Sequence, residues 1–150
     1  MCLHTILRGR EKKEALAKLE DTITVWKTVN MPYAHALIHE IPGGWTTGCR
    51  RWPIHAGVVT FIQNTIQAAK VVGTHGPKIQ EGPQKYRGGG HFWLTEAGAL
   101  AWGTCYTQQL VRCTVKKTDI NTIGSLHGFP VVVVKKATFP QYLGNRKGGN

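Results

Sequence analysis

The chain has 150 residues, of which 41% are hydrophobic, and its 19 Lys and Arg residues against 8 Asp and Glu residues give a formal net charge of +11. A chain of this length buries roughly two thirds of its unfolded surface, so we expect one domain that needs no metal or disulfide framework. No segment approaches the ~18 apolar residues of a membrane-spanning helix, which excludes a membrane partner, and the positive charge favours anionic partners.

The first thirty residues predict a short edge segment, a helix and a strand. Leu3 to Leu7 is a short segment that we expect to add to the edge of a sheet. Arg10 to Glu20 predicts an amphipathic surface helix, because its apolar residues recur at helical spacing. Thr22 to Val29 alternates with β-branched residues, which indicates a strand with one buried face.

The middle of the chain is rich in Gly, Pro and Trp. Residues 31 to 57 are predicted as a long irregular segment, of the kind that is often functional in a compact domain. Val58 to Ile62 is predicted as a strand, and Asn64 to Ala69 as a turn or short helix. Gly73 to Gly90 contains two Gly-Pro pairs and a triple glycine, so it is predicted as a loop with several enforced turns.

The last third predicts three strands and a helix. His91 to Leu94 is a short strand, and Thr95 is the N-cap of a helix from Glu96 to Trp102 that Gly103 ends. A strand is predicted at residues 109–115, a connection at residues 120–128, and a strand buried on both faces at residues 131–134. The basic tail at residues 141–150 is predicted to be disordered. The predicted fold class is α+β, a single domain over residues 1–140 with a mixed or antiparallel sheet and few short helices.

The triple glycine before His91 predicts a small-molecule site. Glycines allow the backbone to approach a ligand closely, and the following His and aromatic residues can hold a ring. Cations for phosphates and aromatic faces for bases complete such a site. The candidate binding residues are Trp26, Lys27, Trp45, Arg50, Arg51, Lys85, Tyr86, Arg87, His91, Phe92 and Thr95.

Metal, cofactor and disulfide chemistry are not predicted. His35 and His39 could share a helix face, but Pro and Gly residues on both sides leave room for barely two turns and no third ligand is evident. The four cysteines have no CxxC spacing and the chain starts without a signal segment, which indicates a reducing cytoplasm. If Met1 is removed, Cys2 becomes an N-terminal thiol, as in the N-terminal hydrolases.

The order of these segments resembles the ADP-ribosyltransferase fold of the toxin and poly-ADP-ribose polymerase superfamily. The resemblance rests on the strand with Trp26 and Lys27, the run Gly88-Gly89-Gly90-His91-Phe92 before an alanine-rich helix, and the strand at residues 111–115. It implies that His91 or Phe92 lies against a nicotinamide-like ring, and that Lys27 or Trp26 takes the place of the first-strand residue that binds the ribose or phosphate.

The chain departs from that superfamily at the catalytic position. The transferases use a glutamate from a late strand to stabilise an oxocarbenium-like transition state, whereas nothing acidic follows Asp119. The chain also resembles small phage proteins that open with Met-Cys-Leu. This resemblance implies a protein of the host cytoplasm that binds and sequesters a nucleotide defence signal, such as a cyclic dinucleotide or an ADP-ribose-type compound.

Other functions stay open at this point. A metal-independent phosphodiesterase would need paired histidines for acid and base catalysis, and the candidates are His4, His91 and His75. An ADP-ribosyltransferase and a nucleic-acid-binding module, the latter favoured by net charge alone, are less favoured. The sequence is compatible with a homodimer, since pockets of this kind are often completed by a neighbouring subunit. It does not determine whether residues 31–57 form a lid.

Overall fold

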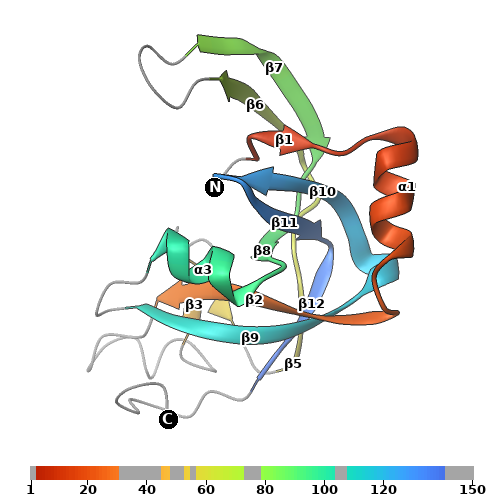
Figure 1. The fold of residues 1–150 in the computed structure, drawn as a ribbon. Coiled ribbons are helices and arrows are strands. Elements are labelled where there is room, and N and C mark those ends of the chain that lie inside the picture. The colour runs from red at the N-terminus through yellow and green to blue at the C-terminus, as the bar shows by residue number, and fades with distance from the viewer. Residues whose placement is uncertain are drawn as a thin grey trace.

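The computed structural model describes residues 3–30, 45–47, 53–54, 57–72, 79–103 and 108–140. These residues form an α+β fold in which every strand pairing is antiparallel (Figure 1). The strands of the main sheet are β1 (Thr5–Ile6), β2 (Thr22–Asn30), β3 (Trp45–Thr47), β4 (Pro53–Ile54), β5 (Gly57–Thr60), β8 (Gly90–Trp93), β9 (Gln108–Lys116), β10 (Ile120–Leu126), β11 (Phe129–Val134) and β12 (Lys136–Phe139).

The main sheet is 10-stranded, and eight of its strands follow the order β1-β10-β11-β8-β2-β9-β12-β5. The remaining two extend it, because β3 pairs with β2 and β4 pairs with β3. A separate two-stranded sheet consists of β6 (Thr65–Val72) and β7 (Ile79–Arg87), which projects at the top of Figure 1. The edge position predicted for Leu3 to Leu7 is confirmed, since β1 is the first strand in this order.

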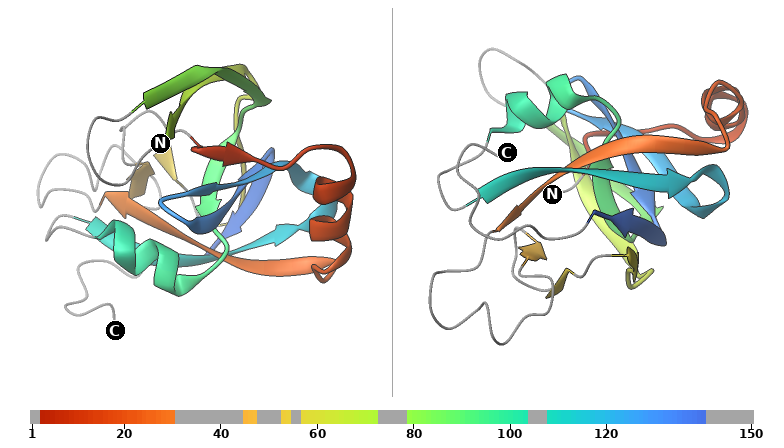
Figure 2. Two further views of the ribbon diagram at one scale, coloured as in Figure 1. Left: turned by 45° about the horizontal axis from the view of Figure 1, so that its top comes forward. Right: turned by 90° about the horizontal axis from the view of Figure 1, so that it is seen from below.

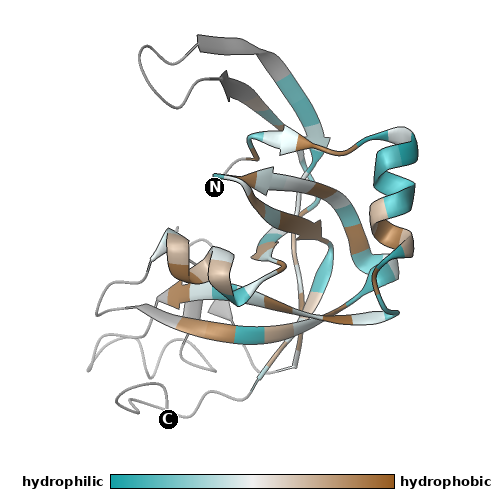
Figure 3. Cartoon of the chain, viewed as in Figure 1, coloured by the Kyte–Doolittle hydropathy of each residue, from teal (hydrophilic) through white to brown (hydrophobic). Residues whose placement is uncertain are grey.

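Strand β11 lies inside the sheet and is covered on both faces. Val131, Val132, Val133 and Val134 are all 0% exposed, which confirms the prediction for this segment. Because side chains alternate along a strand, Val131 and Val133 belong to one core cluster and Val132 and Val134 to another. The apolar character of β11 is visible in Figure 3.

One core contains three phenylalanines from different parts of the sheet. Phe92 of β8 lies 5.8 Å from Phe139 of β12, measured between ring centroids, although β2 and β9 separate these strands in the sheet order. Phe61, directly after β5, lies 5.8 Å from Phe92. The main sheet therefore curls around this core, and the long strands β2 and β9 run side by side across it (Figure 2).

The two described α-helices cover different cores. Helix α1 (Gly9–Ala17) packs Ala15 and Leu16 against the phenylalanine core and exposes its charged side, where Arg10 Nε lies 2.9 Å from Glu14 Oε1. Helix α3 (Glu96–Trp102) packs Ala99 into the second core, which also holds Leu3, Tyr86 and Trp93. A 3-10 turn, η1 (Lys117–Asp119), joins β9 to β10.

The predicted start and end of α3 are confirmed. The backbone N–H of Gly98 donates to Thr95 Oγ1 at 3.1 Å, which satisfies one of the free N–H groups of the first turn. Gly103 follows the last turn with φ +88, and its N–H donates to the carbonyl of Ala99 at 3.2 Å. The predicted strands at residues 22–29, 58–62, 91–94 and 109–115 correspond to β2, β5, β8 and β9.

The predictions for the segments around Gly82-Pro83 were wrong. Residues 64–69 belong largely to strand β6 and residues 79–87 form strand β7, where a turn or helix and a loop were expected. The pairing shifts register between Ala69 and Lys70, opposite Pro83 and Glu81. This irregularity skips Gly82 and accommodates the Gly-Pro pair inside a strand, where it would otherwise interrupt the ladder.

The predicted connection at residues 120–128 was also wrong. Residues 120–126 are strand β10, which pairs along its length with β11. His127 and Gly128 form the tight turn between the two strands, with φ +51 and φ +82. Two residues with positive φ are the geometry of a type I′ hairpin turn. Polar residues within β10 hide this strand from an apolar pattern.

Most of the irregular segment predicted at residues 31–57, and the whole tail at 141–150, lie outside the described residues. In the described part of the chain, no helix is long and apolar enough to cross a membrane.

Candidate functional site

The triple glycine packs against the chain itself. A Cβ on Gly88 would lie 2.6 Å from Asn64 Oδ1, and a Cβ on Gly90 would lie 2.7 Å from the ring of Phe61. A Cβ on Gly89 would meet the carbonyl oxygen of Val134. The expectation that these glycines make room for a ligand is therefore corrected: they make room for Asn64, Phe61 and β11.

His91 and Tyr86 form a buried polar chain that ends at the N-terminal segment. His91 Nε2 lies 2.9 Å from the Tyr86 hydroxyl, and the backbone N–H of Leu3 donates to the same hydroxyl at 3.2 Å. Both side chains are buried, at 8% exposed for His91 and 4% for Tyr86. This polar chain ties β7 and Leu3, two residues before β1, to His91 of β8.

Burial keeps His91 neutral. Desolvation, followed by the charge of Lys27, lowers the pKa of His91 from 6.5 to about 3, while a hydrogen bond with the Gly89 backbone acts in the opposite direction. A bond that raises the pKa of an imidazole is one in which its N–H donates to a carbonyl. We therefore assign the proton to Nδ1, facing the Gly89 carbonyl, and Nε2 accepts from the Tyr86 hydroxyl.

Lys27 points to the other face of the sheet from the His91 ring. Its Nζ donates to the backbone carbonyl of His91 at 2.9 Å and lies 5.2 Å from the ring centroid of Phe92. Burial raises the pKa of Cys113 to about 12, and the charge of Lys27 acts against that rise. Cys113 is therefore a neutral thiol. The Phe92 side chain is 0% exposed and packs in the phenylalanine core, so its ring faces the protein interior.

Two other predicted binding residues have structural contacts. Thr95 uses its hydroxyl as the N-cap of α3. Trp26 is half-buried against the second core, and its Cα is paired across the strands with that of Trp93. Thr95 therefore uses one acceptor position of its hydroxyl for the cap, and Trp26 uses part of its side chain for the core.

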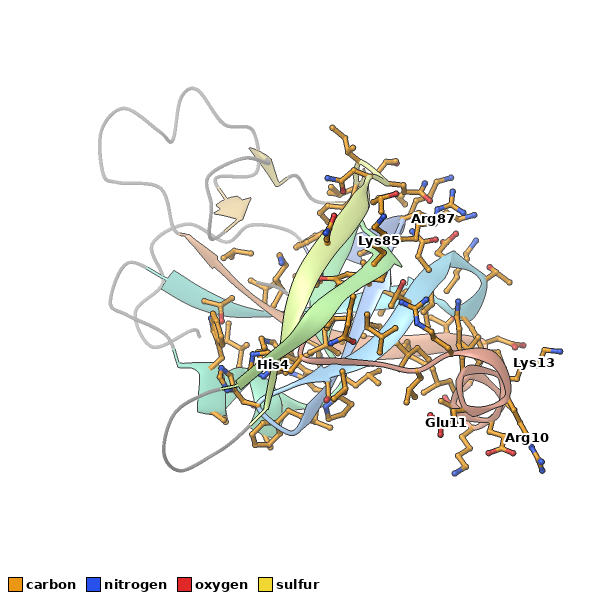
Figure 4. The ribbon with its side chains drawn as sticks, turned by 90° about the horizontal axis from the view of Figure 1, so that it is seen from above. His4, Arg10, Glu11, Lys13, Lys85 and Arg87 are labelled. Carbon is orange, nitrogen blue, oxygen red and sulfur yellow. The ribbon has the colours of Figure 1, made fainter. Side chains whose placement is uncertain are left out.

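Three basic side chains gather where β1 and β7 meet, and we call Arg8, Lys85 and Arg87 the β7 basic surface. Alternation along β7 places Lys85 and Arg87 outside and Tyr86 inside. The Arg8 guanidinium donates to the Lys85 carbonyl, and the Thr122 hydroxyl donates to the Arg87 carbonyl at 3.0 Å. Figure 4 shows Lys85 and Arg87 close together, with Arg10 and Lys13 directed outward from α1.

The β7 basic surface has no acidic partner among the described residues. The ion pairs of the described residues join Arg10 to Glu14 and Lys135 to Asp119, and none includes Arg8, Lys85 or Arg87. The Arg8 guanidinium bonds to the Lys85 carbonyl and the Arg87 carbonyl accepts from Thr122, while all three residues are exposed to solvent. This arrangement can attract and bind an anion.

His4 lies beside His127, a residue that the sequence analysis did not select. The ring centroids are 4.7 Å apart in an edge-to-face arrangement, and the backbone N–H of His127 donates to His4 Nδ1 at 3.5 Å. The ring of Trp102 lies 6.1 Å from that of His127, at an interplanar angle of 32°. We call His4, His127 and Trp102 the His–Trp cluster.

The printed contacts of the two predicted histidines differ: His4 packs against His127, whereas His91 bonds to Tyr86. The backbone N–H of Leu3, next to His4, donates to the same Tyr86 hydroxyl. His75, Arg50 and Arg51 lie outside the described residues, and of Trp45 only the backbone in β3 is described. Among the residues that the structure describes, no three His, Cys, Asp or Glu side chains are grouped so as to hold a metal ion.

Sequence reasoning missed Arg8, His127 and Trp102. Gly128, directly before the apolar run of β11, is a turn signal that places His127 beside a strand end, although the polar residues of β10 conceal the strand before it. Nothing local marks Arg8 as a neighbour of Lys85, because 77 positions separate them. No family model matches the chain, and no curated protein or solved structure gives a significant match.

Proposed function

We propose that this protein binds and sequesters a small anionic nucleotide, with the β7 basic surface holding its phosphates. The observation that carries the proposal is the convergence of Lys85 and Arg87 of β7 with Arg8, the residue before α1, without an acidic partner among the described residues. Guanidinium and ammonium groups are the side chains that phosphates prefer, because their hydrogen bonds are charge-assisted.

Binding is favoured over ADP-ribosyl transfer by the chemistry of the last strands. Strands β11 and β12 carry no Asp or Glu that could stabilise an oxocarbenium-like transition state. The antiparallel α+β fold is compatible with an ADP-ribosyltransferase-like ancestry, which remains part of the proposal. The ligand class we infer is a cyclic dinucleotide or an ADP-ribose-type defence signal, met in the host cytoplasm, and a homodimer is compatible with it.

One observation favours the alternative, a metal-independent phosphodiesterase. Such an enzyme needs two histidines close together for acid and base catalysis, and His4 and His127 are neighbours. His91 does not fit this role, because a pKa of about 3 leaves it unprotonated at neutral pH and its hydroxyl partner occupies Nε2. Mass spectrometry of the incubated ligand, described next, separates binding from cleavage.

The test incubates the protein with NAD, ADP-ribose, cyclic ADP-ribose isomers and cyclic dinucleotides, followed by mass spectrometry of the solution and of compounds released by heat. We expect one compound to be depleted and recovered intact. A linear or hydrolysed product would establish the phosphodiesterase, and no depletion of any compound would overturn the proposal.

A charge-reversal pair tests the surface itself. Lys85→Glu with Arg87→Glu should reduce retention of the depleted compound at least about tenfold, since each lost charge-assisted contact is worth about a factor of ten. The matched control is Lys13→Glu with Lys18→Glu, which changes the net charge equally on exposed positions of α1 and just beyond it. Equal loss in both variants would show that only overall charge matters.

A further inference from the structure

The His–Trp cluster is an exposed aromatic surface. Trp102 is 49% exposed and Leu100, on the same helix, is 60% exposed. The cluster draws its residues from three places: the residue before β1, the turn between β10 and β11, and the last turn of α3. Figure 4 shows His4 on the α3 side of the molecule, apart from Lys85 and Arg87.

The turn that carries His127 does not require an imidazole. A type I′ turn needs positive φ at both central positions, and Asn-Gly meets this need best. His127 has φ +51 and Gly128 has φ +82. The His127 ring instead packs between His4 and Trp102, so the turn serves to present the ring.

The rings are placed to receive a flat heteroaromatic group. The His127 and Trp102 planes are inclined by 32°, and their neighbour Trp93 lies 5.9 Å from Trp102, which supports the indole from beneath. Bases stack on such Trp and His surfaces without needing a specific sequence. The exposed His127 imidazole adds hydrogen-bonding groups at the ring edge.

Strand β1 connects this cluster to the β7 basic surface. His4 precedes β1 and Arg8 follows it, so the two residues stand about 13 Å apart along an extended backbone. His4 is also tied to β7, because its carbonyl accepts from Gln84 Nε2 at 3.1 Å, next to Lys85. A ligand that reaches both surfaces must be longer than a mononucleotide.

We propose that the His–Trp cluster is a base-binding subsite for a ligand with a two-nucleoside span, whose phosphates lie on the β7 basic surface. This inference rests on the proposed function and deepens it, because it selects dinucleotides and ADP-ribose-type compounds over mononucleotides. The cluster supplies stacking, and the cations supply the charge.

The test measures the binding of cyclic di-AMP, ADP-ribose, adenosine and inorganic pyrophosphate by calorimetry. The variants are His127→Asn, which keeps the turn geometry, and Trp102→Leu; Val58→Ala, at another exposed apolar position (67% exposed), is the matched control. Both cluster variants should weaken the tighter of cyclic di-AMP and ADP-ribose about tenfold or more, abolish adenosine binding and leave pyrophosphate binding unchanged.

The outcomes separate this inference from the proposed function. Wild-type affinity for all base-containing probes in His127→Asn and Trp102→Leu would overturn the subsite, even if pyrophosphate binds. Failure of the wild-type protein to bind pyrophosphate and both nucleotides would overturn the proposed function. Adenosine that still binds and quenches tryptophan fluorescence in the wild type, but not in Trp102→Leu, would then preserve the cluster as a ring-binding site.

Discussion

His91 shows how the surroundings of a single residue decide its chemistry. Its ring is buried, one nitrogen faces the Tyr86 hydroxyl and the other is assigned to the Gly89 carbonyl. A histidine available for catalysis near neutral pH keeps a pKa close to that pH. The structure therefore uses His91 to join β7 and β8, although its sequence context suggested a ligand.

The depressed pKa of His91 predicts a pH-dependent stability. The unfolded chain binds a proton at His91 below pH 6.5, whereas the folded chain does so only near pH 3. The contribution of His91 to the free energy of unfolding is therefore fully present above about pH 6.5, and it decreases as the pH falls from 6.5 to about 3. Between about pH 7 and pH 5 we expect a loss of about 2 kcal/mol from this residue alone.

Urea unfolding at several pH values measures this loss in the wild-type protein and in His91→Gln. The variant should be less stable at pH 7, because Gln fits the Tyr86 bond less well, but its stability should change less between pH 7 and pH 5. His127→Gln, at an exposed position, is the comparison for a histidine-to-glutamine change outside the core. Equal slopes in wild type and His91→Gln would refute the assignment of a buried neutral imidazole.

At the scale of elements, the close approach of β8 to the segment after β5 predicts that Gly90 tolerates no side chain. Gly90→Ala places a Cβ 2.7 Å from the Phe61 ring, which also packs on Phe92 and Phe139. Overpacking of this kind costs about 1–3 kcal/mol of unfolding free energy. Chemical denaturation measures the loss.

Gly128→Asn is the comparison for this prediction. Gly128 has φ +82 but nothing within 4 Å of the added Cβ, and Asn tolerates the left-handed conformation. Its cost should be about 1 kcal/mol, the lower end of the penalty for a residue with a side chain in the left-handed region. A Gly90→Ala protein as stable as Gly128→Asn would mean that the phenylalanine core adjusts freely and that the triple glycine is not needed for packing.

The elements with strong local patterns were predictable from the sequence. Helix α3 has an N-cap at Thr95 and a stop at Gly103, and β11 has a run of four valines, so each is determined by neighbouring residues. Strands β6, β7 and β10 were missed for the opposite reason. Their ladders depend on a partner strand, a register shift opposite Pro83 or a turn at His127, none of which an apolar pattern reveals.

The candidate site was predictable only in part. Lys85 and Arg87 were selected as cations beside the triple glycine, in a segment predicted as a loop, and it is the alternation along strand β7 that places both outside. Arg8, His127 and Trp102 come from distant parts of the chain and meet their neighbours only after the sheet has formed. The triple glycine misled, because a close approach by the chain's own residues leaves the same sequence pattern as a close approach by a ligand.

For the whole molecule, the net charge of +11 must be weighed against where the charges lie. Arg10 and Lys13 point outward from α1 (Figure 4), and Arg112 and Lys116 are exposed on β9, which pairs with β2 and β12 and not with β7. A protein that wraps nucleic acid gathers such residues in one continuous stripe. The described cations are spread over several sides, which favours a local site for a small ligand.

This distribution predicts a weak salt dependence of ligand binding. A ligand with two phosphates on the β7 basic surface should give a slope of log Kd against log salt between about 1 and 2, since the slope is slightly less than the number of phosphates contacted. Single-stranded DNA that engages six or more of the cations would give a slope above about 4. Titrating ADP-ribose and a fluorescent 20-nucleotide DNA over the same salt range compares the two. If the DNA binds more tightly than any nucleotide at physiological salt, and with the steeper slope, the positive charge acts as a whole and the protein is a nucleic-acid-binding module. If rising salt releases the DNA while the nucleotide stays bound, the three cations of the β7 basic surface act as a local site.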